Sequence, residues 1–357
     1  MTSGTHEQLP GVSFVVIGRN EGDLLMRCLA SIHAADYPAD KIELIYVDTD
    51  STDGSCEAAE RLGAKVVRIN PQRRSAATAR NAGFEFAKHE LVHFLDGDTI
   101  LDPAWLRKAV AAIAAAADIA IVFGRREEID PSANVYHFCM HHDWYVPPGK
   151  LETCGGDILI HKAVLRRAGG YDPSLIAGEE RDLCCRIVRD QGLGMLRLDE
   201  PMTLHDINMT HFRQYWRRCF RSGYAYAQVA ARYQTLRAWR RICNRNILHA
   251  ATLVTMVGLS IVFGSALPII IWTVLIAIGI VRNAGRCHSR VGSIGGSLVY
   301  SLHHYLSKFP TVMGHFAYYR VRLLGANPVE LIEYQQPTTP RPAGPTAPDV
   351  MEESRTS

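Results

Sequence analysis

Several features that define other protein classes are missing from this chain of 357 residues. The amino terminus lacks a basic run followed by an apolar segment, so the sequence indicates no secretory signal. The nine cysteines are odd in number and never spaced as Cys-x-x-Cys, which favours reduced cytosolic thiols over a disulfide framework or a zinc site. No internal repeat or nucleic-acid-binding motif is evident, and we therefore expect no nucleic-acid partner.

Acidic residues are absent between Phe212 and Asn246, where arginines are frequent. This segment is strongly basic although the net charge of the whole chain is only +3. The following residues, 247–281, are almost wholly apolar and include no Asp, Glu, Lys or Arg. A membrane surface or a lipid diphosphate therefore suits the basic segment better than nucleic acid does.

The apolar segment 247–281 is too long for one ordinary membrane span and long enough for two short spans joined near residues 263–268. By the positive-inside rule, its flanks predict a multi-pass protein of the inner or plasma membrane, with the preceding domain and both termini cytoplasmic. The alternative is the buried helical hairpin of a soluble protein. Basic residues flank both ends but not the central turn: Arg240, Arg241 and Arg245 before it, and Arg282, Arg286 and Arg290 after it.

The remaining carboxyl-terminal sequence mixes apolar residues with histidine, tyrosine and lysine. Residues 290–330 predict amphipathic helices lying on the cytosolic face of the lipid bilayer, with a third, imperfect span as the alternative. Lys308 and the histidines argue against that third span. Residues 335–357 are rich in proline and threonine and predict a disordered tail, and residues 1–10 form an amino-terminal tail.

Two carboxylates separated by one glycine, Asp96 and Asp98, follow a short apolar run at residues 91–95. The run predicts a buried strand, and the glycine allows the chain to turn so that both side chains face one ligand. Carboxylates suit Mg²⁺ or Mn²⁺, which take their other ligands from water and substrate phosphates. A solvated turn is the alternative for an isolated Asp-Gly-Asp sequence.

Apolar strands alternate with helical segments through the first part of the chain. Strands at residues 12–17, 42–47 and 65–69 precede helices at residues 24–33, 56–62 and 76–88 respectively. This alternation predicts an α/β fold with a mostly parallel, Rossmann-like sheet and flanking helices. Ligands of such sheets bind beyond the carboxyl ends of the strands, where we expect Arg19, Asp48 and Asp98 to converge.

The ordered motifs resemble those of family 2 glycosyltransferases with the GT-A fold, over residues 11–240. They are Asn20-Glu21, Asp48 followed by Ser51-Thr52-Asp53-Gly54-Ser55, Ala79-Arg80-Asn81-Ala82-Gly83, Asp96-Gly97-Asp98, and Gly178-Glu179-Glu180-Arg181-Asp182-Leu183.

The resemblance implies that the chain binds a nucleotide-sugar donor and a divalent metal. Asp48 and Glu21 would contact the base and ribose, and Arg80 would lie near the nucleotide. Asp98 would be the main metal ligand, supported by Asp96. The neighbouring Arg19, Asn20 and Asp50 complete the candidate donor-binding residues. Thr49 stands where the family often has a second aspartate, and Ile17-Gly18-Arg19 replaces the more usual Pro-Thr-Tyr, so the donor base stays open.

An inverting transfer needs a base that takes the proton of the acceptor hydroxyl. In the family this base is usually the aspartate of a Glu-Asp pair, and Glu180 takes its place here. Glu179 and Asp182 are the alternatives, and an exposed acidic helix start would explain all three without catalysis. Two adjacent carboxylates have pKa values that move apart when both are buried.

Three further sites complete the predicted set. Asp157 lies in a segment resembling the floor beneath the acceptor, or else in a simple turn into a strand. His205 would complete the metal shell, or else be structural. Arg217 and Arg221, four residues apart on a predicted helix, would bind the diphosphate of a polyprenyl-linked acceptor.

The sequence therefore predicts a metal-dependent, inverting, membrane-anchored glycosyltransferase acting on a lipid-linked or other membrane-associated acceptor in cell-surface polysaccharide or glycolipid synthesis. One rival is a nucleotidyltransferase that makes sugar nucleotides. It is disfavoured because no glycine-rich, arginine-containing triphosphate loop follows the first strand. The other rival, a catalytically silent nucleotide-sugar sensor or membrane scaffold, rests only on the departures at Thr49 and Glu180.

Overall fold

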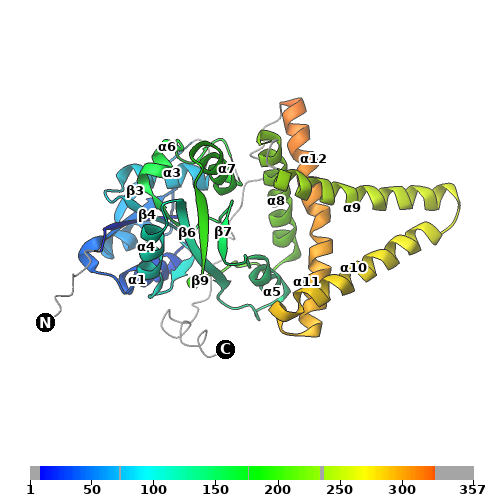
Figure 1. Ribbon diagram of the computed structural model, residues 1–357, viewed down its shortest axis with the longest axis horizontal. Helices are drawn as coiled ribbons and strands as arrows, with labels where there is room; N and C mark the ends of the chain where they lie inside the picture. Colours follow the sequence, from blue (N-terminus) through cyan, green and yellow to red (C-terminus); the bar gives the residue numbers. More distant parts are fainter. Residues whose placement is uncertain (1–8, 72–73, 176, 234–236, 326–357) are drawn as a thin grey trace.

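The computed structural model describes residues 9–71, 74–175, 177–233 and 237–325. The chain forms a sheet domain in its amino-terminal part and a set of five helices in its carboxyl-terminal part (Figure 1). Most of the amino-terminal tail, part of the segment 290–330 and the whole tail 335–357 lie outside the described residues.

The sheet contains nine strands in the order β3-β2-β1-β4-β8-β6-β9-β5, and β7 pairs with β9. Their bounds are β1 Val12–Gly18, β2 Ile42–Asp48, β3 Lys65–Arg68, β4 Leu91–Asp96, β5 Thr99–Leu101, β6 Ile119–Glu128, β7 Gly149–Leu151, β8 Ile158–His161 and β9 Gly194–His205.

The sheet is mixed, so the prediction of a mostly parallel sheet is wrong. Among the described residues, four strand pairs are parallel (β1 with β2, β2 with β3, β1 with β4, and β6 with β9) and four are antiparallel. Strand β8 inserts antiparallel between β4 and β6. Apolar periodicity indicates where a strand lies but not which strand it pairs with, because pairing depends on residues far apart in the chain.

The amino-terminal βα units form as the alternation predicted. Strands β1, β2 and β4 are buried along most of their length and form the centre of the core. Strands that are buried on both faces of a sheet have continuous apolar sequences, which explains why apolar and polar residues do not alternate in these strands. The helices of this domain are α1 Asp23–His33, α2 Ser55–Arg61, α3 Ala76–Phe86, α4 Trp105–Ala115, α5 Val135–Asp143, α6 Lys162–Arg167 and α7 Glu179–Gln191, with the 3₁₀ turn η1 Ala39–Lys41.

Helix α12 returns along the chain to pack beside α8 (Figure 1). Two glycines let these helices approach closely. A Cβ at Gly223 would lie 2.0 Å from the carbonyl oxygen of Thr311, and one at Gly314 would lie 2.1 Å from that of Phe220. The five carboxyl-terminal helices are α8 Phe212–Arg232, α9 Arg237–Val262, α10 Leu267–Val291, α11 Ile294–Leu306 and α12 Lys308–Leu324.

Helices α9 and α10 form a hairpin that projects away from the sheet domain (Figure 1). By length and composition, residues Trp239–Val262 and Leu267–Val291 are long and apolar enough to cross a membrane. The two helical segments have 24 and 25 residues, so both are longer than the short spans predicted from the apolar run alone. Only 6% of the apolar window of each segment is buried, which disfavours the buried soluble hairpin.

Helix α11 binds the sheet domain through one face and leaves an apolar face exposed. The carboxylate of Asp143, at the end of α5, accepts hydrogen bonds from the hydroxyl of Tyr300 across 2.8 Å and from Nε2 of His303 across 2.9 Å. Exposed apolar side chains recur every fourth residue along α11, at Ile294, Leu298, Leu302 and Leu306. This amphipathic pattern is the one expected of a helix that lies at a membrane surface.

Candidate active site

The predicted metal ligands Asp96, Asp98 and His205 come together at the ends of β4 and β9. One ligand atom from each residue lies within 4.8 Å of the others. The carboxylate of Asp98 lies 3.3 Å from Nε2 of His205. Gly97 lets the loop pass closely under β1, because a Cβ there would lie 3.1 Å from the carbonyl oxygen of Ile17. The strand pairing of β5 with β9 brings His205 opposite Thr99, directly after the Asp-Gly-Asp turn.

The three side chains are not equally suited to bind a divalent cation. A separation of 3.3 Å suits two ligands of one ion better than a strong hydrogen bond, and both groups are mostly buried. Nδ1 of His205 is buried and has no hydrogen-bond partner among the described residues. Both oxygens of Asp96 already accept guanidinium hydrogen bonds, from Arg80 and from Arg126. Asp98 is therefore the better first ligand.

Two arginines, the buried Arg80 and the partly buried Arg126, hold Asp96 in its ionised form. Arg80 Nη2 and Arg126 Nη2 each donate to one oxygen of Asp96 across 2.9 Å. Although burial opposes ionisation, these guanidinium groups hold the pKa of Asp96 well below its usual value. Burial likewise opposes ionisation of Asp98, yet the neighbouring His205 keeps the pKa of Asp98 below its usual value. Both carboxylates are thus ionised at neutral pH.

Asp157 lies beneath this cluster. Its carboxylate accepts hydrogen bonds from the backbone N–H of Asp96 across 3.2 Å and from the hydroxyl of Thr203 across 3.0 Å. It also lies 3.3 Å from Nε of Arg126, and burial raises the pKa of Asp157. With 2% of its surface exposed, Asp157 is buried against the Asp96-Gly97-Asp98 turn, and its acceptor role stays a prediction.

The predicted base lies across Arg80 from the metal cluster, at the start of α7. Arg80 Nη1 lies 3.0 Å from the carboxylate of Glu179 and 3.5 Å from that of Glu180. The side chain of Glu180 is 20% exposed and that of Glu179 only 8%, so Glu180 is the more accessible carboxylate. Burial and the adjacent charge of Glu180 raise the pKa of Glu179 to about 7, against the opposing effect of Arg80.

Contacts around α7 separate the remaining alternatives. The carboxylate of Asp182 accepts hydrogen bonds from Arg186, Arg232 and the hydroxyl of Tyr233, and its side chain is 1% exposed. Asp182 is therefore bound into the structure and not available as a base.

Gly156 lies against Arg80 on the other side of the site. A larger residue at this position is disfavoured, because a Cβ there would lie 2.3 Å from Nη2 of Arg80.

The candidate donor-binding residues line the carboxyl ends of β1 and β2. Asp48 is buried, and its carboxylate accepts hydrogen bonds from the backbone N–H groups of Asp50 and Ser51 across 3.0 and 2.9 Å. Asp48, Asp50 and Ser51 border a pocket of about 210 Å³ that also includes Arg68 and Asn70.

Hydrogen bonds join the loop that follows β1 to the loop that follows β2. The amide oxygen of Asn20 accepts a hydrogen bond from the N–H of Thr52, and Nε of Arg19 donates to the carbonyl oxygen of Asp50. Glu21 lies beside the Asp96-Gly97-Asp98 turn, because its Cγ would be 3.4 Å from a Cβ at Gly97. Arg19, Asn20 and Asp50 therefore shape the loops around the site.

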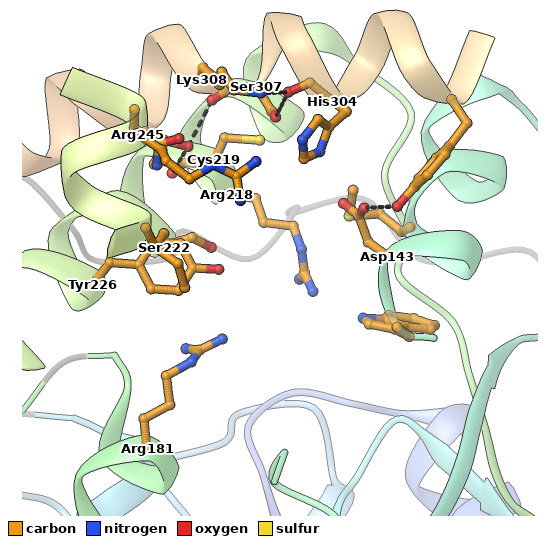
Figure 2. Close-up of a pocket in the computed structure, with 16 residues that line it drawn as sticks. Asp143, Arg181, Arg218, Cys219, Ser222, Tyr226, Arg245, His304, Ser307 and Lys308 are labelled. Atoms are coloured by element: carbon orange, nitrogen blue, oxygen red, sulfur yellow. Dashed lines mark hydrogen bonds between the residues drawn. The ribbon is translucent and has the colours of Figure 1, made fainter. Parts of the chain in front are cut away.

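A second, larger pocket of about 420 Å³ lies between the sheet domain and the carboxyl-terminal helices (Figure 2). Helix α8 contributes Arg218 and Ser222 to its lining, but not Arg217 or Arg221. The predicted pair Arg217 and Arg221 thus lies outside the lining of this pocket, and diphosphate binding by that pair stays a prediction. A four-residue spacing identifies which side chains share a face, but not which face meets the rest of the protein.

Two residues near the metal cluster were missed from the sequence. Arg126 contacts both Asp96 and Asp157, and its guanidinium lies 5.4 Å from the ring centre of Trp144. Trp144 also packs edge-on against His205, with ring centres 4.9 Å apart. The only local signal for Arg126 was a charged residue at the end of an apolar strand. Nothing local marked Trp144, which reaches the site from the end of α5.

This mixed sheet, with acidic groups at the ends of its strands, has the architecture of a GT-A glycosyltransferase. Residues 13–167 match the model of the family described as Glycosyl transferase family 2. The chain therefore carries a family 2 glycosyltransferase domain.

Curated relatives of the chain are similar over part of their length. The glycosyltransferase AglE of Haloferax volcanii is 31% identical over 109 residues, covering 29% of this chain and 36% of the relative. The poly-beta-1,6-N-acetyl-D-glucosamine synthase of Staphylococcus epidermidis is 29% identical over 106 residues, with 29% of this chain and 25% of the relative covered. Glycosyltransferase GlyG of Streptococcus pneumoniae is 27% identical over 165 residues, or 45% of this chain and 51% of the relative. The chain thus spans between 25% and 51% of the length of these relatives.

A solved structure extends the likeness of fold beyond that domain. The mannosyltransferase PcManGT from Pyrobaculum calidifontis, solved in complex with GDP-Man and Mn²⁺, superposes with a TM-score of 0.55 and 18% identity. The match covers 82% of this chain and 86% of the other. At this identity the likeness shows the fold alone.

Proposed function

We propose that this protein transfers a sugar from a nucleotide-sugar donor to a lipid-linked or otherwise membrane-associated acceptor, with inversion at the anomeric carbon and in dependence on Mg²⁺ or Mn²⁺. The transfer would serve the synthesis of a cell-surface polysaccharide or glycolipid. The observation that carries the proposal is the clustering of Asp98 and His205 with Asp96, which Arg80 joins to Glu180 by lying 2.9 Å from Asp96 and 3.5 Å from Glu180.

Each side chain has a role that follows from its contacts. A divalent cation held by Asp98 and His205, with Asp96 in support, would neutralise charge on the leaving nucleoside diphosphate. Glu180 takes the proton of the acceptor hydroxyl while the oxygen of that hydroxyl forms a bond to the anomeric carbon. The bond from that carbon to the diphosphate breaks, and its electron pair leaves with the nucleoside diphosphate. Arg80 is a positioning residue, because it holds Asp96 and Glu179 while itself only 2% exposed.

A membrane location accounts for the exposed apolar surface of the hairpin. Leu248, Val254 and Ile261 on α9 and Ile270 and Val274 on α10 are among its large exposed side chains. A contiguous apolar surface of this kind is costly in water and stable in a bilayer. The arginines that flank the hairpin support insertion in the inner or plasma membrane with the sheet domain and both termini cytoplasmic.

The test is turnover of a panel of nucleotide sugars by the full-length protein in detergent, with membrane lipid extract as acceptor and Mn²⁺ or EDTA present. We expect metal-dependent release of a nucleoside diphosphate and a glycosidic bond of inverted configuration, read by NMR. Release of pyrophosphate would instead identify a nucleotidyltransferase. Donor binding without turnover of any nucleotide sugar would identify a silent sensor and contradict the proposal.

A further inference from the structure

The pocket of about 420 Å³ is lined by four basic side chains from four different helices. Arg181 comes from α7, Arg218 from α8, Arg245 from α9 and Lys308 from α12. Figure 2 shows Arg218 pointing into the middle of the pocket and Arg181 extending toward it from the opposite wall. Convergence from separate helices distinguishes this arrangement from a basic stripe on one solvated helix face.

The positive charge of the pocket is not balanced within the protein. Among the residues that the structure describes, none of these four cations forms an ion pair. The one carboxylate of the lining, Asp143, already accepts hydrogen bonds from Tyr300 and His303. Arg181 and Lys308 are half-buried, whereas Arg218 and Arg245 are exposed to the solvent of the pocket. Four cations that face one cavity without a partner anion create a positive potential, so the pocket favours an anionic ligand.

Burial and the proximity of other positive charges lower the pKa of two of these side chains. Burial and the nearby charge of Arg245 lower the pKa of Lys308 to about 8. Burial, together with the charges of Arg126 and Arg221, lowers the pKa of Arg218. A bound phosphate would reverse both effects, because an anion stabilises the charged forms.

The pocket adjoins the candidate active site on two sides. Trp144, which forms part of its wall, packs against His205 of the metal cluster. Arg181 follows Glu180 directly in the chain, so the opposite wall adjoins the proposed base. A ligand whose charged group fills the pocket would therefore present the attached sugar to Glu180 and the donor.

The pocket also lies where the apolar hairpin surface begins. Ile242, Arg245 and Asn246 on α9 line it, and the exposed Leu248 follows within one helical turn. A ligand of this pocket thus meets positive charge at one end and apolar surface at the other. A lipid that carries a phosphate or diphosphate has this chemistry, whereas a water-soluble phosphate uses only half of it.

We propose that this pocket binds the phosphate groups of the lipid-linked acceptor, with Arg218, Arg245, Lys308 and Arg181 as their ligands. The proposal rests on the proposed function, because it identifies the class of acceptor for the same active site. It replaces the pair Arg217 and Arg221, which lie outside the lining of the pocket. The lipid chain would extend from the pocket along the apolar surface of α9.

The test measures binding of geranylgeranyl diphosphate to the full-length protein in detergent, with EDTA present so that no metal-bound diphosphate contributes. We expect Arg218→Gln and Lys308→Gln each to weaken binding by about 10-fold or more, because each removes a charge-assisted hydrogen bond. The matched control is Arg213→Gln, which removes an exposed arginine of the same helix outside the pocket and should keep wild-type affinity. Equal binding by the wild-type protein and both pocket variants would overturn the proposal.

Two further probes separate the sources of the phosphate. Geranylgeraniol lacks the charged group and inorganic pyrophosphate lacks the chain, so we expect each to bind at least about 10-fold more weakly than the lipid diphosphate. Pyrophosphate binding as tight as that of the lipid would show a site for free phosphate and contradict the lipid assignment.

Separate control measurements distinguish a loss of pocket binding from a folding defect and from a loss of sugar transfer. Each variant should retain the wild-type Tm and Mn²⁺-dependent nucleotide binding, and Arg245→Gln replaces any variant that does not. The binding measurement contains no donor and therefore does not depend on catalysis. Binding of the lipid diphosphate together with no sugar transfer in the separate turnover assay would contradict the proposed function and leave the pocket standing. Unchanged transfer to a lipid acceptor by all pocket variants would contradict the pocket and leave the function standing.

Discussion

Arg80 and Asp96 form an ion pair of 2.9 Å that joins α3 to the end of β4. The other terminal nitrogen of the same guanidinium contacts Glu179 on α7. One arginine therefore links the Asp96-Gly97-Asp98 turn to the helix that carries the proposed base. Arg80 and Glu179 are both buried, so the removal of Arg80 would leave the carboxylate of Glu179 in the interior without its nearest cation.

The first prediction concerns the metal. Asp98→Asn should abolish Mn²⁺-dependent turnover, because it removes the ligand charge that no arginine already neutralises. The Tm without metal should change little, since the side chain lies on a turn at the end of a strand. Asp190→Asn, at an exposed position paired with Arg189, is the matched control and should retain activity. Full metal-dependent turnover by Asp98→Asn would refute the assignment of this ligand.

The second prediction concerns the base. Glu180→Gln keeps the shape of the side chain but accepts no proton, so kcat should fall by about 10²-fold or more while donor affinity stays close to wild type. Steady-state kinetics and donor binding are measured on the same preparations. If Glu179→Gln alone produces this loss of kcat, with Glu180→Gln close to wild type, the base has been assigned to the wrong carboxylate.

The third prediction is a dependence of stability on pH. The pKa of Glu179 rises from 4.5 to about 7 on folding, through burial and the charge of Glu180, while Arg80 opposes the rise. The folded protein therefore binds this proton more tightly than the unfolded chain does, and the contribution to stability is lost as pH rises from about 4.5 to 7. Glu179→Gln removes this loss, so the Tm of the variant minus that of the wild type should be more positive at pH 8 than at pH 5. The same difference in Tm at pH 5 and at pH 8 would show that the pKa of Glu179 does not change on folding.

The fourth prediction concerns the close contact of α8 and α12. Gly314→Ala forces these helices apart and should lower the free energy of unfolding by about 1–3 kcal/mol, as overpacking of a buried contact does. Gly295→Ala is the matched control, because a Cβ at this helical glycine would meet nothing within 4 Å. Alanine is the better helix former, so the control should be neutral or slightly stabilising. Equal stability of the two variants by chemical denaturation would show that α12 does not dock on α8 as described.

The sequence predicts the first half of the sheet domain well because its signals are local. Apolar runs at residues 42–47 and 91–95 correspond closely to β2 and β4, and the polar residues that follow them lie at the predicted edge. The convergence of Asp96, Asp98 and His205 also agrees with expectation, although these residues are more than 100 positions apart at the extremes. A motif at a strand end limits where its side chains can lie, which makes such a prediction possible.

The sequence does not predict what depends on contacts between distant segments. The antiparallel insertion of β8, the return of α12 to α8 and the pocket that these helices form with the sheet domain leave no periodic pattern. Arg218 illustrates the difficulty. It shares a basic segment with Arg213, Arg217 and Arg221, and only the packing of α8 determines which of them faces the pocket.

The central claim is that a sugar passes from a nucleotide donor to a lipid-linked acceptor at the membrane. The most direct measurement follows the radiolabelled sugar after incubation of the full-length protein with Mn²⁺, nucleotide sugar and membrane vesicles. The account predicts label in the organic phase, lost with EDTA and lost again in Glu180→Gln. Label found only as free sugar or as a water-soluble product would contradict it.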